Sequence, residues 1–311
     1  MTSTNHNNQL QPAEQVASIL HSVEQHLLGK QLVIRYALTS LLAKGHLLLE
    51  DVPGVGKTTL AHALASSLGL NYQRVQFTSD LLPADLIGVS VYLRDAGKFE
   101  FHRGPIFSQV LLADEINRAS PKTQSALLEA MAEQQVTHDS ATHLLPDPFF
   151  VIATQNPQNQ IGTHALPESQ LDRFMMRLSI GYPDAAAEKA LYLGQRRDKV
   201  DLSKLATHDV LQLQAQVNSV TVSSALADYV IALVSATREP NRFTHGLSPR
   251  GGLALLQAAK AWAFIDGRSF VTPEDIQMVF APVAGHRLLP NSTIDAATAI
   301  CQDLVKSVAI P

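Results

Sequence analysis

Cysteine is nearly absent from this chain, because Cys301 is the only one among its 311 residues. A single thiol excludes an internal disulfide, which fits a reducing compartment. Long apolar runs are also missing: no uninterrupted stretch approaches the ~18 residues needed to cross a bilayer. The opening residues lack the basic and apolar regions of a signal peptide. We therefore expect a cytoplasmic protein without membrane insertion, and a flexible tail over residues 1–10.

An excess of positive charge is missing too. The 24 lysines and arginines face 28 aspartates and glutamates, which gives a net charge of −4 at pH 7. Such a chain has no positive field to attract a polyphosphate backbone, which disfavours nucleic acid as a partner. Hydrophobic residues make up 46% of the chain, which is enough to bury a sizeable core. At roughly 150 residues per domain, the length suggests two domains.

Apolar runs of strand length alternate with helical stretches in the first part of the chain. Helical spacing of apolar residues begins at Val16 and returns over residues 32–43, 60–68 and 123–132. Continuous apolar strands separated by helices predict an α/β fold with a parallel sheet covered on both faces. The runs are "HLLL" (46–49), "YQRVQF" (72–77), "VLLAD" (110–114), "FFVIAT" (149–154) and "MRLSI" (176–180).

Strand signals stop after "GYPD" (181–184), and helical periodicity continues nearly to the end of the chain. Thr272 is followed by proline and two acids, which is typical of a helix N-terminus. We therefore predict an α/β nucleotide-binding domain over residues 11–183 and a smaller all-helical domain over residues 184–311.

The stretch "LLLEDVPGVGKTTLA" resembles a phosphate-binding loop, although Asp51 stands where the pattern G-x-x-x-x-G-K-[ST] has its first glycine. Gly54 and Gly56 lie where the chain must turn tightly against a ligand. Lys57 can reach the β and γ phosphates, and Thr58 can hold Mg2+. A side chain at position 51 is tolerated if it points away from the phosphates. A plain glycine-rich turn is the alternative, but the preceding strand and following helix favour phosphate binding.

Two further strands end in polar side chains. "VLLADEINRAS" delivers Asp114, which can hold the Mg2+ shell through water, and Glu115, which can polarise an attacking water. "FFVIATQNP" delivers Asn156, which can orient water or touch the γ phosphate. Alone, the first motif could be a charged turn and the second a common Asn-Pro turn. After a phosphate loop, both favour a nucleotide site.

Together these motifs resemble the AAA+ ATPases, and most closely the MoxR family. The similarity spans residues 29–287, nearly the whole chain. Asp51 is consistent with this resemblance, because members of this family often carry a residue other than glycine at the first glycine position of the phosphate loop. The phrases that carry the resemblance are "LLLEDVPGVGKT", "FTSDLLPADLIG", "GKFEFHRGPIF", "LLADEINRASPKTQSALLEAM", "VIATQNP", "LPESQLDRFMM" and "SPRGGLALLQAAKAWAFIDGR".

The resemblance implies a P-loop sheet between helices with a helical lid, ATP as substrate and Mg2+ as its metal. Lys57 and Glu115 would be catalytic with Asn156 as sensor 1, while Thr58 and, through water, Asp114 would hold Mg2+. Lys30 stands where the family more often has glutamine after the two residues that enclose adenine. The residues expected to bind nucleotide are Leu28, Gly29, Pro53, Gly54, Val55, Gly56, Lys57, Thr58, Thr59 and Asp114.

Two arginines complete the catalytic set that the resemblance implies. Arg173 in "LDRF" matches the arginine finger, which serves the nucleotide of the adjacent subunit, and Arg250 in "SPR" matches sensor 2, which reaches from the lid to the γ phosphate. A surface ion pair is the alternative for Arg173, and a lid-holding arginine is the alternative for Arg250. A finger supplied by a neighbour predicts a ring, expected to be a hexamer.

Two segments have the pattern of β-hairpins, residues 88–105 and 135–147. The first resembles the helix-2 insertion that projects into the ring pore in this branch of AAA+ proteins. The second contains His138, Asp139 and His143 but no lysine, a surface that suits a protein better than a phosphate chain. We interpret these histidines as solvated residues rather than metal ligands.

The expected function is therefore a chaperone-like ATPase that remodels or activates a protein client, with a partner carrying a von Willebrand A domain. Three alternatives stay open. They are a nucleotide-switched structural module with little turnover, a metal-chelatase-like motor subunit, and a nucleic-acid motor. The acidic balance and the hairpins disfavour the nucleic-acid motor, and the sequence contains no porphyrin-specific feature.

Overall fold

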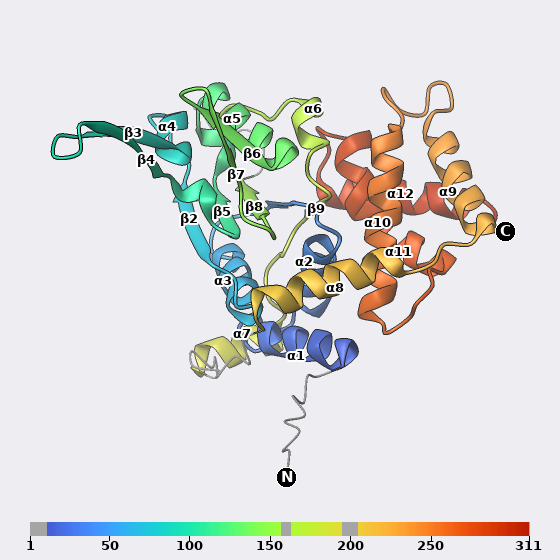
Figure 1. The fold of residues 1–311 in the computed structure, drawn as a ribbon. Coiled ribbons are helices and arrows are strands. Elements are labelled where there is room, and N and C mark those ends of the chain that lie inside the picture. The colour runs from blue at the N-terminus through green and yellow to red at the C-terminus, as the bar shows by residue number, and fades with distance from the viewer. Residues whose placement is uncertain (1–10, 157–162, 195–204, 311) are drawn as a thin grey trace, which may run out of the picture.

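The computed structural model describes residues 11–156, 163–194 and 205–310, so the expected tail over residues 1–10 lies outside the described residues. Its centre is a five-stranded parallel sheet with the order β2-β5-β8-β1-β9 (Figure 1). The predicted α/β class and parallel sheet are confirmed. The strands are β1 (Leu47–Glu50), β2 (Tyr72–Gln76), β5 (Val110–Asp114), β8 (Phe150–Gln155) and β9 (Met176–Leu178).

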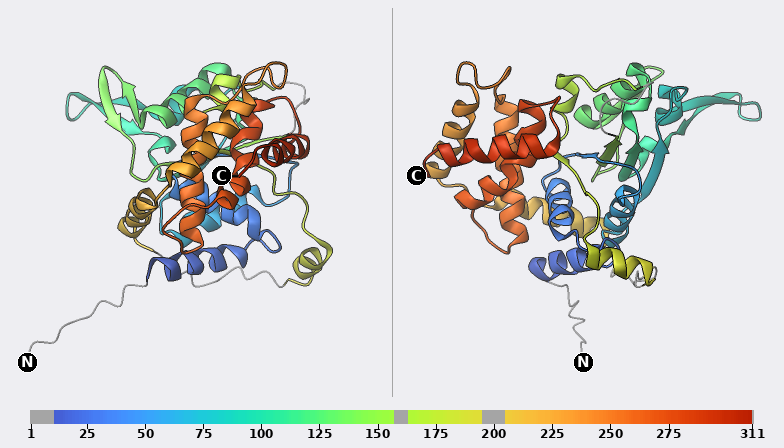
Figure 2. Two further views of the ribbon diagram at one scale, coloured as in Figure 1. Left: turned by 90° about the vertical axis from the view of Figure 1, so that its right-hand side faces the viewer. Right: turned by 180° about the vertical axis from the view of Figure 1, so that it is seen from behind.

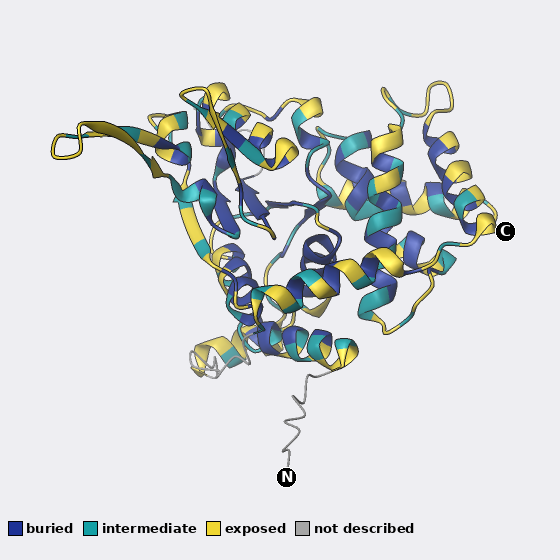
Figure 3. Ribbon diagram, viewed as in Figure 1, coloured by how far each residue is buried: buried dark blue, intermediate teal, exposed yellow. Residues whose placement is uncertain are grey.

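Helices cover both faces of this sheet, because successive side chains of each apolar strand point to opposite faces. Leu47 and Leu49 belong to the hydrophobic cluster that contains helices α1, α2 and α3, whereas Leu48 belongs to the cluster that contains α4 and α5. Figure 3 shows the buried strands between these helices. The helices are α1 (Pro12–Glu24), α2 (Gln31–Leu42), α3 (Lys57–Ser67), α4 (Pro83–Ile87) and α5 (Pro121–Glu133).

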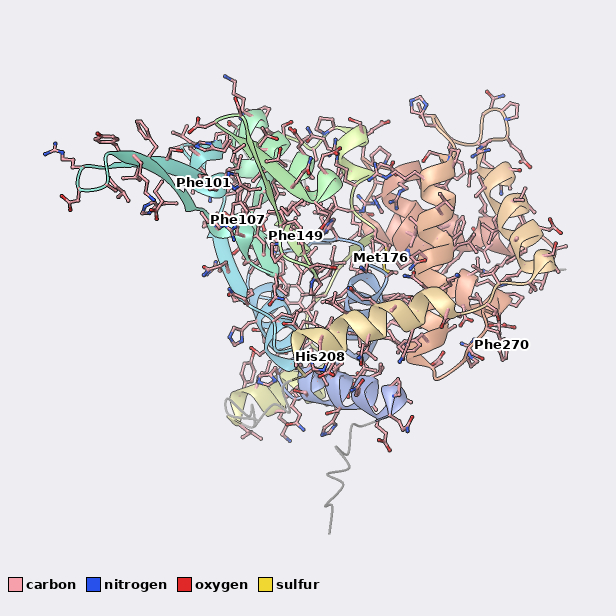
Figure 4. The ribbon with its side chains drawn as sticks, viewed as in Figure 1. Phe101, Phe107, Phe149, Met176, His208 and Phe270 are labelled. Atoms are coloured by element: carbon pink, nitrogen blue, oxygen red, sulfur yellow. The ribbon has the colours of Figure 1, made fainter. Side chains whose placement is uncertain are left out.

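Both predicted hairpins are present: β3 (Gly88–Leu93) pairs with β4 (Lys98–Arg103), and β6 (Gln135–His138) pairs with β7 (Ala141–Leu144). The hairpin β3–β4 projects away from the sheet (Figure 1). Aromatic stacking joins the two hairpins, since the Phe101 ring lies 4.4 Å from His143 and 4.8 Å from His138 between centroids. Figure 4 labels Phe101 at the base of the projecting hairpin.

The C-terminal part is helical, and α9 to α12 form a bundle beside the sheet (Figure 2). The α1–α3 hydrophobic cluster continues into this bundle, so the two packing units share one core. Within the described ranges, no helix is long and apolar enough to cross a membrane. The remaining helices are α6 (Glu168–Leu171), α7 (Ala185–Tyr192), α8 (Thr207–Ser219), α9 (Ser224–Thr237), α10 (Pro249–Ile265), α11 (Pro273–Leu288) and α12 (Ile294–Ser307), with 3-10 turns η1 (Pro105–Phe107) and η2 (Ile116–Arg118).

Candidate active site

The glycine-rich loop between β1 and α3 requires its glycines. Gly54 has a φ of +85° and Gly56 a φ of +103°, a backbone region that disfavours side chains. At Gly56 an added Cβ would lie only 2.7 Å from Cδ1 of Leu27. Helix α3 begins directly afterwards, at Lys57, and no described side chain caps its N-terminus. The loop therefore aims the amide groups of the first helical turn at a space where an anion can bind.

That space is a pocket of about 380 Å3 at the carboxyl edge of the sheet. It brings together most of the residues that the sequence predicts, from the phosphate loop, from β5 and from β8. It also contains two residues of β2 that the sequence analysis missed, Arg74 and Gln76. The lining residues are Pro53, Gly54, Gly56, Lys57, Thr58, Thr59, Arg74, Gln76, Asp114, Glu115 and Asn156.

Lys57 is buried at the base of this pocket with 8% of its surface exposed. Its Nζ donates to the backbone oxygen of Asp51 at 2.6 Å and to Oδ1 of Asn156 at 3.3 Å. Burial lowers the pKa of the Lys57 ammonium, while the negative charges of Asp51, Asp114 and Glu115 oppose this shift. The ammonium is thus partly desolvated and held beside the loop that would surround a phosphate.

Asp114 is fixed from both sides at the end of β5. Its Oδ2 accepts from Nη2 of Arg74 at 2.6 Å, and its Oδ1 accepts from the hydroxyl of Thr154 at 2.6 Å. The same threonine accepts the backbone N–H of Glu115 at 2.9 Å. Glu115 adopts a φ of +56°, which is uncommon for a residue with a side chain and ends the strand abruptly.

The Glu115 carboxylate accepts hydrogen bonds on both oxygens. Oε2 accepts from Nε2 of Gln76 at 2.7 Å and from Nη1 of Arg118 at 2.8 Å, while Oε1 accepts from Nδ2 of Asn156 at 3.2 Å. Oε2 accepts two hydrogen bonds, whereas Oε1 accepts only one, so Oε1 retains a lone pair that can accept from a water. Alternation along "YQRVQ" places Arg74 and Gln76 on one face of β2, which was the sequence signal for these two residues.

The side chain of Asp51 points away from the pocket, as the sequence analysis requires of it. Its Oδ2 accepts from the hydroxyl of Ser179 at 2.8 Å and from the backbone N–H groups of Ile180 and Gly181, each at 2.7 Å. Its Oδ1 accepts the N–H of Val52 at 2.9 Å. The departure from the glycine pattern therefore leaves the phosphate loop open.

The expected adenine residues lie next to the loop but outside the described lining of the pocket. Leu28 and Gly29 directly follow Leu27, whose side chain approaches Gly56. Gly29 has a φ of +73°, and a Cβ there would lie 3.2 Å from Cβ of Ala187 in α7. Val55 is buried beneath the loop, at 7% exposure. Contact of Leu28, Gly29 and Val55 with a nucleotide remains a prediction.

The structure does not bring Arg173 or Arg250 to the pocket of their own chain. Among the described residues, neither belongs to the lining, and Nη1 of Arg173 donates to the backbone oxygen of Leu128 in α5 at 2.5 Å. Arg250 is exposed in the first turn of α10. Burial is the main cause that lowers the pKa values of His46 and Arg287, and the charge of Arg250 acts in the same direction. The roles of Arg173 and Arg250 at a phosphate remain predictions, and a neighbouring chain is where either could act.

Arg287 of α11 is a buried arginine that holds the loop over residues 172–174, and we call it the clamp residue. Its Nε pairs with Oδ1 of Asp172 at 2.6 Å, and its Nη2 donates to the backbone oxygens of Asp172 at 3.1 Å and Phe174 at 2.8 Å. Burial lowers the pKa of this guanidinium, and Asp172 opposes the shift. Helix α11 thereby holds the loop that carries Arg173.

Comparisons with known proteins agree with this geometry. A family described as "ATPase family associated with various cellular activities (AAA)" matches residues 46–176, and an AAA lid domain matches residues 235–305. The chain is 38% identical to Chaperone MoxR1 of Mycobacterium tuberculosis, over 96% of this chain and 85% of that protein. It is 35% identical to Protein MoxR of Paracoccus denitrificans, over 84% and 85%. A crystal structure of a candidate ATPase from Cytophaga hutchinsonii superposes with a TM-score of 0.87 at 38% identity, covering 96% of each chain.

Proposed function

Because the chain belongs to the MoxR family of AAA+ ATPases, we propose that it hydrolyses MgATP within a ring and uses the reaction to remodel or activate a protein client. One observation carries the catalytic part of this proposal. Lys57, Asp114, Glu115 and Asn156 come from three different elements and converge on one pocket. We expect this machine to work in the cytoplasm.

Lys57 would bind the β and γ phosphates. In the present arrangement its ammonium is satisfied by Asp51 and Asn156. A phosphate in the loop would replace these two neutral acceptors of Lys57 with charged oxygens. Hydrogen bonds from an ammonium to charged oxygens are stronger than those to neutral oxygens. Release of Asn156 from Lys57 would also leave its amide oxygen available to position water. Phosphate binding and water placement are thereby linked through one side chain.

Glu115 would polarise the attacking water, and it would do so more strongly after losing a hydrogen bond. Gln76, Arg118 and Asn156 hold its carboxylate in a geometry where both oxygens accept. A carboxylate that already accepts from an arginine and two amides attracts a water proton less strongly. We propose that nucleotide binding or contact with a neighbouring subunit rearranges these donors.

The residues present fit a Mg2+ ion, because hydroxyl and carboxylate oxygens are the ligands that this ion prefers. Thr58 and Asp114 would hold it, and the ion would supply positive charge to the phosphate oxygens. Both oxygens of Asp114 already accept from Arg74 and Thr154. This engagement supports contact through water rather than direct coordination by Asp114.

Arg173 and Arg250 support action between subunits. Neither arginine lies in the pocket of its own chain, and the clamp residue Arg287 lies near both. Arg287 binds the loop around Arg173. It also lies beside Gly251, the neighbour of Arg250, because its Cδ would be 3.4 Å from a Cβ added there. We propose that this surface faces the nucleotide of the adjacent subunit in a ring, expected to be hexameric. Each ATP would then be enclosed by two chains.

A protein client is supported by the hairpins and by the relatives. Tyr92 is 52% and Phe99 71% exposed on the projecting hairpin, which offers apolar surface to a polypeptide. One relative is named a chaperone. We propose that the client is activated together with a partner that carries a von Willebrand A domain, as the family resemblance implies.

The Glu115→Gln variant tests the catalytic proposal. It should bind ATP with wild-type affinity while phosphate release falls at least about a hundredfold, because the amide cannot take a proton from water. Steady-state phosphate release and isothermal titration calorimetry measure the two effects. Glu133→Gln, at the exposed end of α5, is the matched control and should leave both unchanged.

Loss of ATP binding in Glu115→Gln would contradict the assigned role, since Glu115 would then be part of the binding surface. Phosphate release by the wild type should also be unaffected by DNA or RNA. A stimulation by either would instead favour a nucleic-acid motor. The trapped Glu115→Gln form with ATP is suited to capturing the client.

A further inference from the structure

A short segment of the chain connects the two ends of the expected nucleotide site. Residues 179–181 bind the carboxylate of Asp51 behind the phosphate loop, as described above. The next residue, Tyr182, accepts a hydrogen bond on its backbone oxygen from Nζ of Lys30 at 2.7 Å. The same stretch of chain thus contacts the phosphate loop first and the expected adenine loop second.

Helix α7 completes this connection. Asp184 caps the helix by accepting the N–H of Ala187 at 2.7 Å. Both residues lie against Gly29, where an added Cβ would approach Ala187 at 3.2 Å and Oδ2 of Asp184 at 3.5 Å. The segment 179–187, named here the spanning segment, therefore contacts both the phosphate loop and residues 28–30.

Asp51 is the only described residue of the phosphate loop seen to bind this segment with its side chain. It is 8% exposed, and two of its three donors there are backbone N–H groups, which stay in place whatever their side chains are. Hydrogen bonds to an ionised carboxylate are stronger than neutral ones and fix their donors closely. Glycine at position 51 would provide none of them.

We propose that Asp51 is a specificity-determining residue that sets the position of the adenine-binding end relative to the phosphate loop. This inference rests on the proposed role of Leu28 and Gly29 at the adenine. Asp51 acts through the spanning segment and touches no part of ATP. It therefore strengthens binding of the complete nucleotide but not of the phosphate chain alone, which the negative charge of Asp51 near Lys57 disfavours.

The test compares MgATP with inorganic tripolyphosphate and Mg2+ on the full chain by isothermal titration calorimetry. Asp51→Gly, which restores the common glycine pattern, should weaken ATP binding about tenfold, because the adenine-binding residues would be misplaced relative to the phosphate loop. It should not weaken tripolyphosphate binding, because it removes a negative charge near Lys57. Lys57→Ala should weaken both ligands. Asp209→Asn, which removes a carboxylate that accepts one backbone N–H at the start of α8, should change neither.

Ser179→Ala keeps the proposal testable if Asp51→Gly does not fold. It removes one of the three donors and leaves the carboxylate in place, so it should shift ATP affinity in the same direction by about threefold. Unchanged ATP affinity in both variants, or equal weakening of both ligands by Asp51→Gly, would overturn the inference. If the wild type binds ATP no more tightly than tripolyphosphate, the proposed adenine site itself is wrong.

Discussion

His46 shows how a single buried residue makes the stability of this protein depend on pH. Its Nδ1 accepts the N–H of Val151 at 3.1 Å and its Nε2 lies 3.4 Å from the backbone oxygen of Met131, an arrangement that needs a neutral ring. Burial lowers the pKa of His46 to about 4 from its ordinary value of 6.5. Protonation would remove the acceptor at Nδ1.

Stability should therefore fall on acidification. The folded-state pKa of His46 lies below the unfolded value, so between pH 6.5 and pH 4 the unfolded chain binds more protons. The contribution is complete above pH 6.5 and amounts to about 2 kcal/mol lost between pH 7 and pH 5. His286 is buried with a lowered pKa and adds in the same direction.

Urea unfolding at pH 7 and pH 5 measures this loss. His46→Gln should be less stable at pH 7 but should show a smaller difference between the two pH values. The exposed His208, labelled in Figure 4, is the control, and His208→Gln should behave as the wild type. An equal pH dependence in His46→Gln and the wild type would contradict the assignment.

At the scale of elements, the two hairpins are held together by one aromatic side chain. Phe101 of β4 stacks on His138 and His143 of the other hairpin, and stacked aromatic pairs contribute about 0.5–1.5 kcal/mol each. Phe101→Ala should accelerate amide hydrogen exchange in β6–β7 about tenfold, since opening becomes easier by about 1.4 kcal/mol. Hydrogen-exchange mass spectrometry measures this.

Phe99 provides the matched control for that change. It faces Tyr92 on the exposed part of the same hairpin, with ring centroids 5.2 Å apart. Phe99→Ala removes an identical side chain from the same strand, and exchange in β6–β7 should stay as in the wild type. Equal acceleration by both variants would mean that hairpin β3–β4 influences β6–β7 through its general stability and not through Phe101.

The elements themselves were largely predictable from the sequence. Strand and helix positions agree with the structure within a few residues, because continuous apolar runs and glycine-rich turns are local signals. The site was predictable where residues follow strand ends, as Asp114, Glu115 and Asn156 do. Arg74 and Gln76 were missed because polar residues on β2, a strand at the sheet edge, have the pattern of a solvated face. Arg74 bonds Asp114 and Gln76 bonds Glu115, and both contacts depend on the pairing of β2 with β5.

The position of the lid could not be predicted, because it depends on contacts between distant residues. Arg177 of β9 pairs with Glu50 at 3.5 Å and donates to backbone oxygens of Pro290 and Ser292 beyond α11. Together with Arg287, it fixes the bundle beside the sheet. No local pattern in the sequence marks either arginine.

At the scale of the whole molecule, the proposed action of Arg173 between subunits predicts that ATPase activity depends on assembly. Arg173→Ala should lower turnover about a thousandfold, the usual effect of losing a finger arginine. Activity per chain of the wild type should rise with protein concentration. Steady-state phosphate release across a concentration series, paired with light scattering for the assembly, measures both.

Mixing two inactive variants distinguishes the neighbour from the same chain. Lys57→Ala retains Arg173, and Arg173→Ala retains an intact pocket, so mixed rings should contain complete sites and recover part of the turnover. Each variant alone, at the same total concentration, is the control. A mixture as inactive as its components would show that Arg173 does not act on a neighbouring pocket.

The clamp formed by Arg287 has a mechanical consequence. Pulling α11 away from the loop over residues 172–174 would strand a buried guanidinium without its acceptors, at a cost of several kcal/mol. The helical bundle and the loop of Arg173 must then travel as a single rigid body. In the ring that we propose, a tilt of that body in one subunit would displace the Arg173 side chain presented to the next subunit. The orientation of one chain would then set the geometry of hydrolysis in its neighbour.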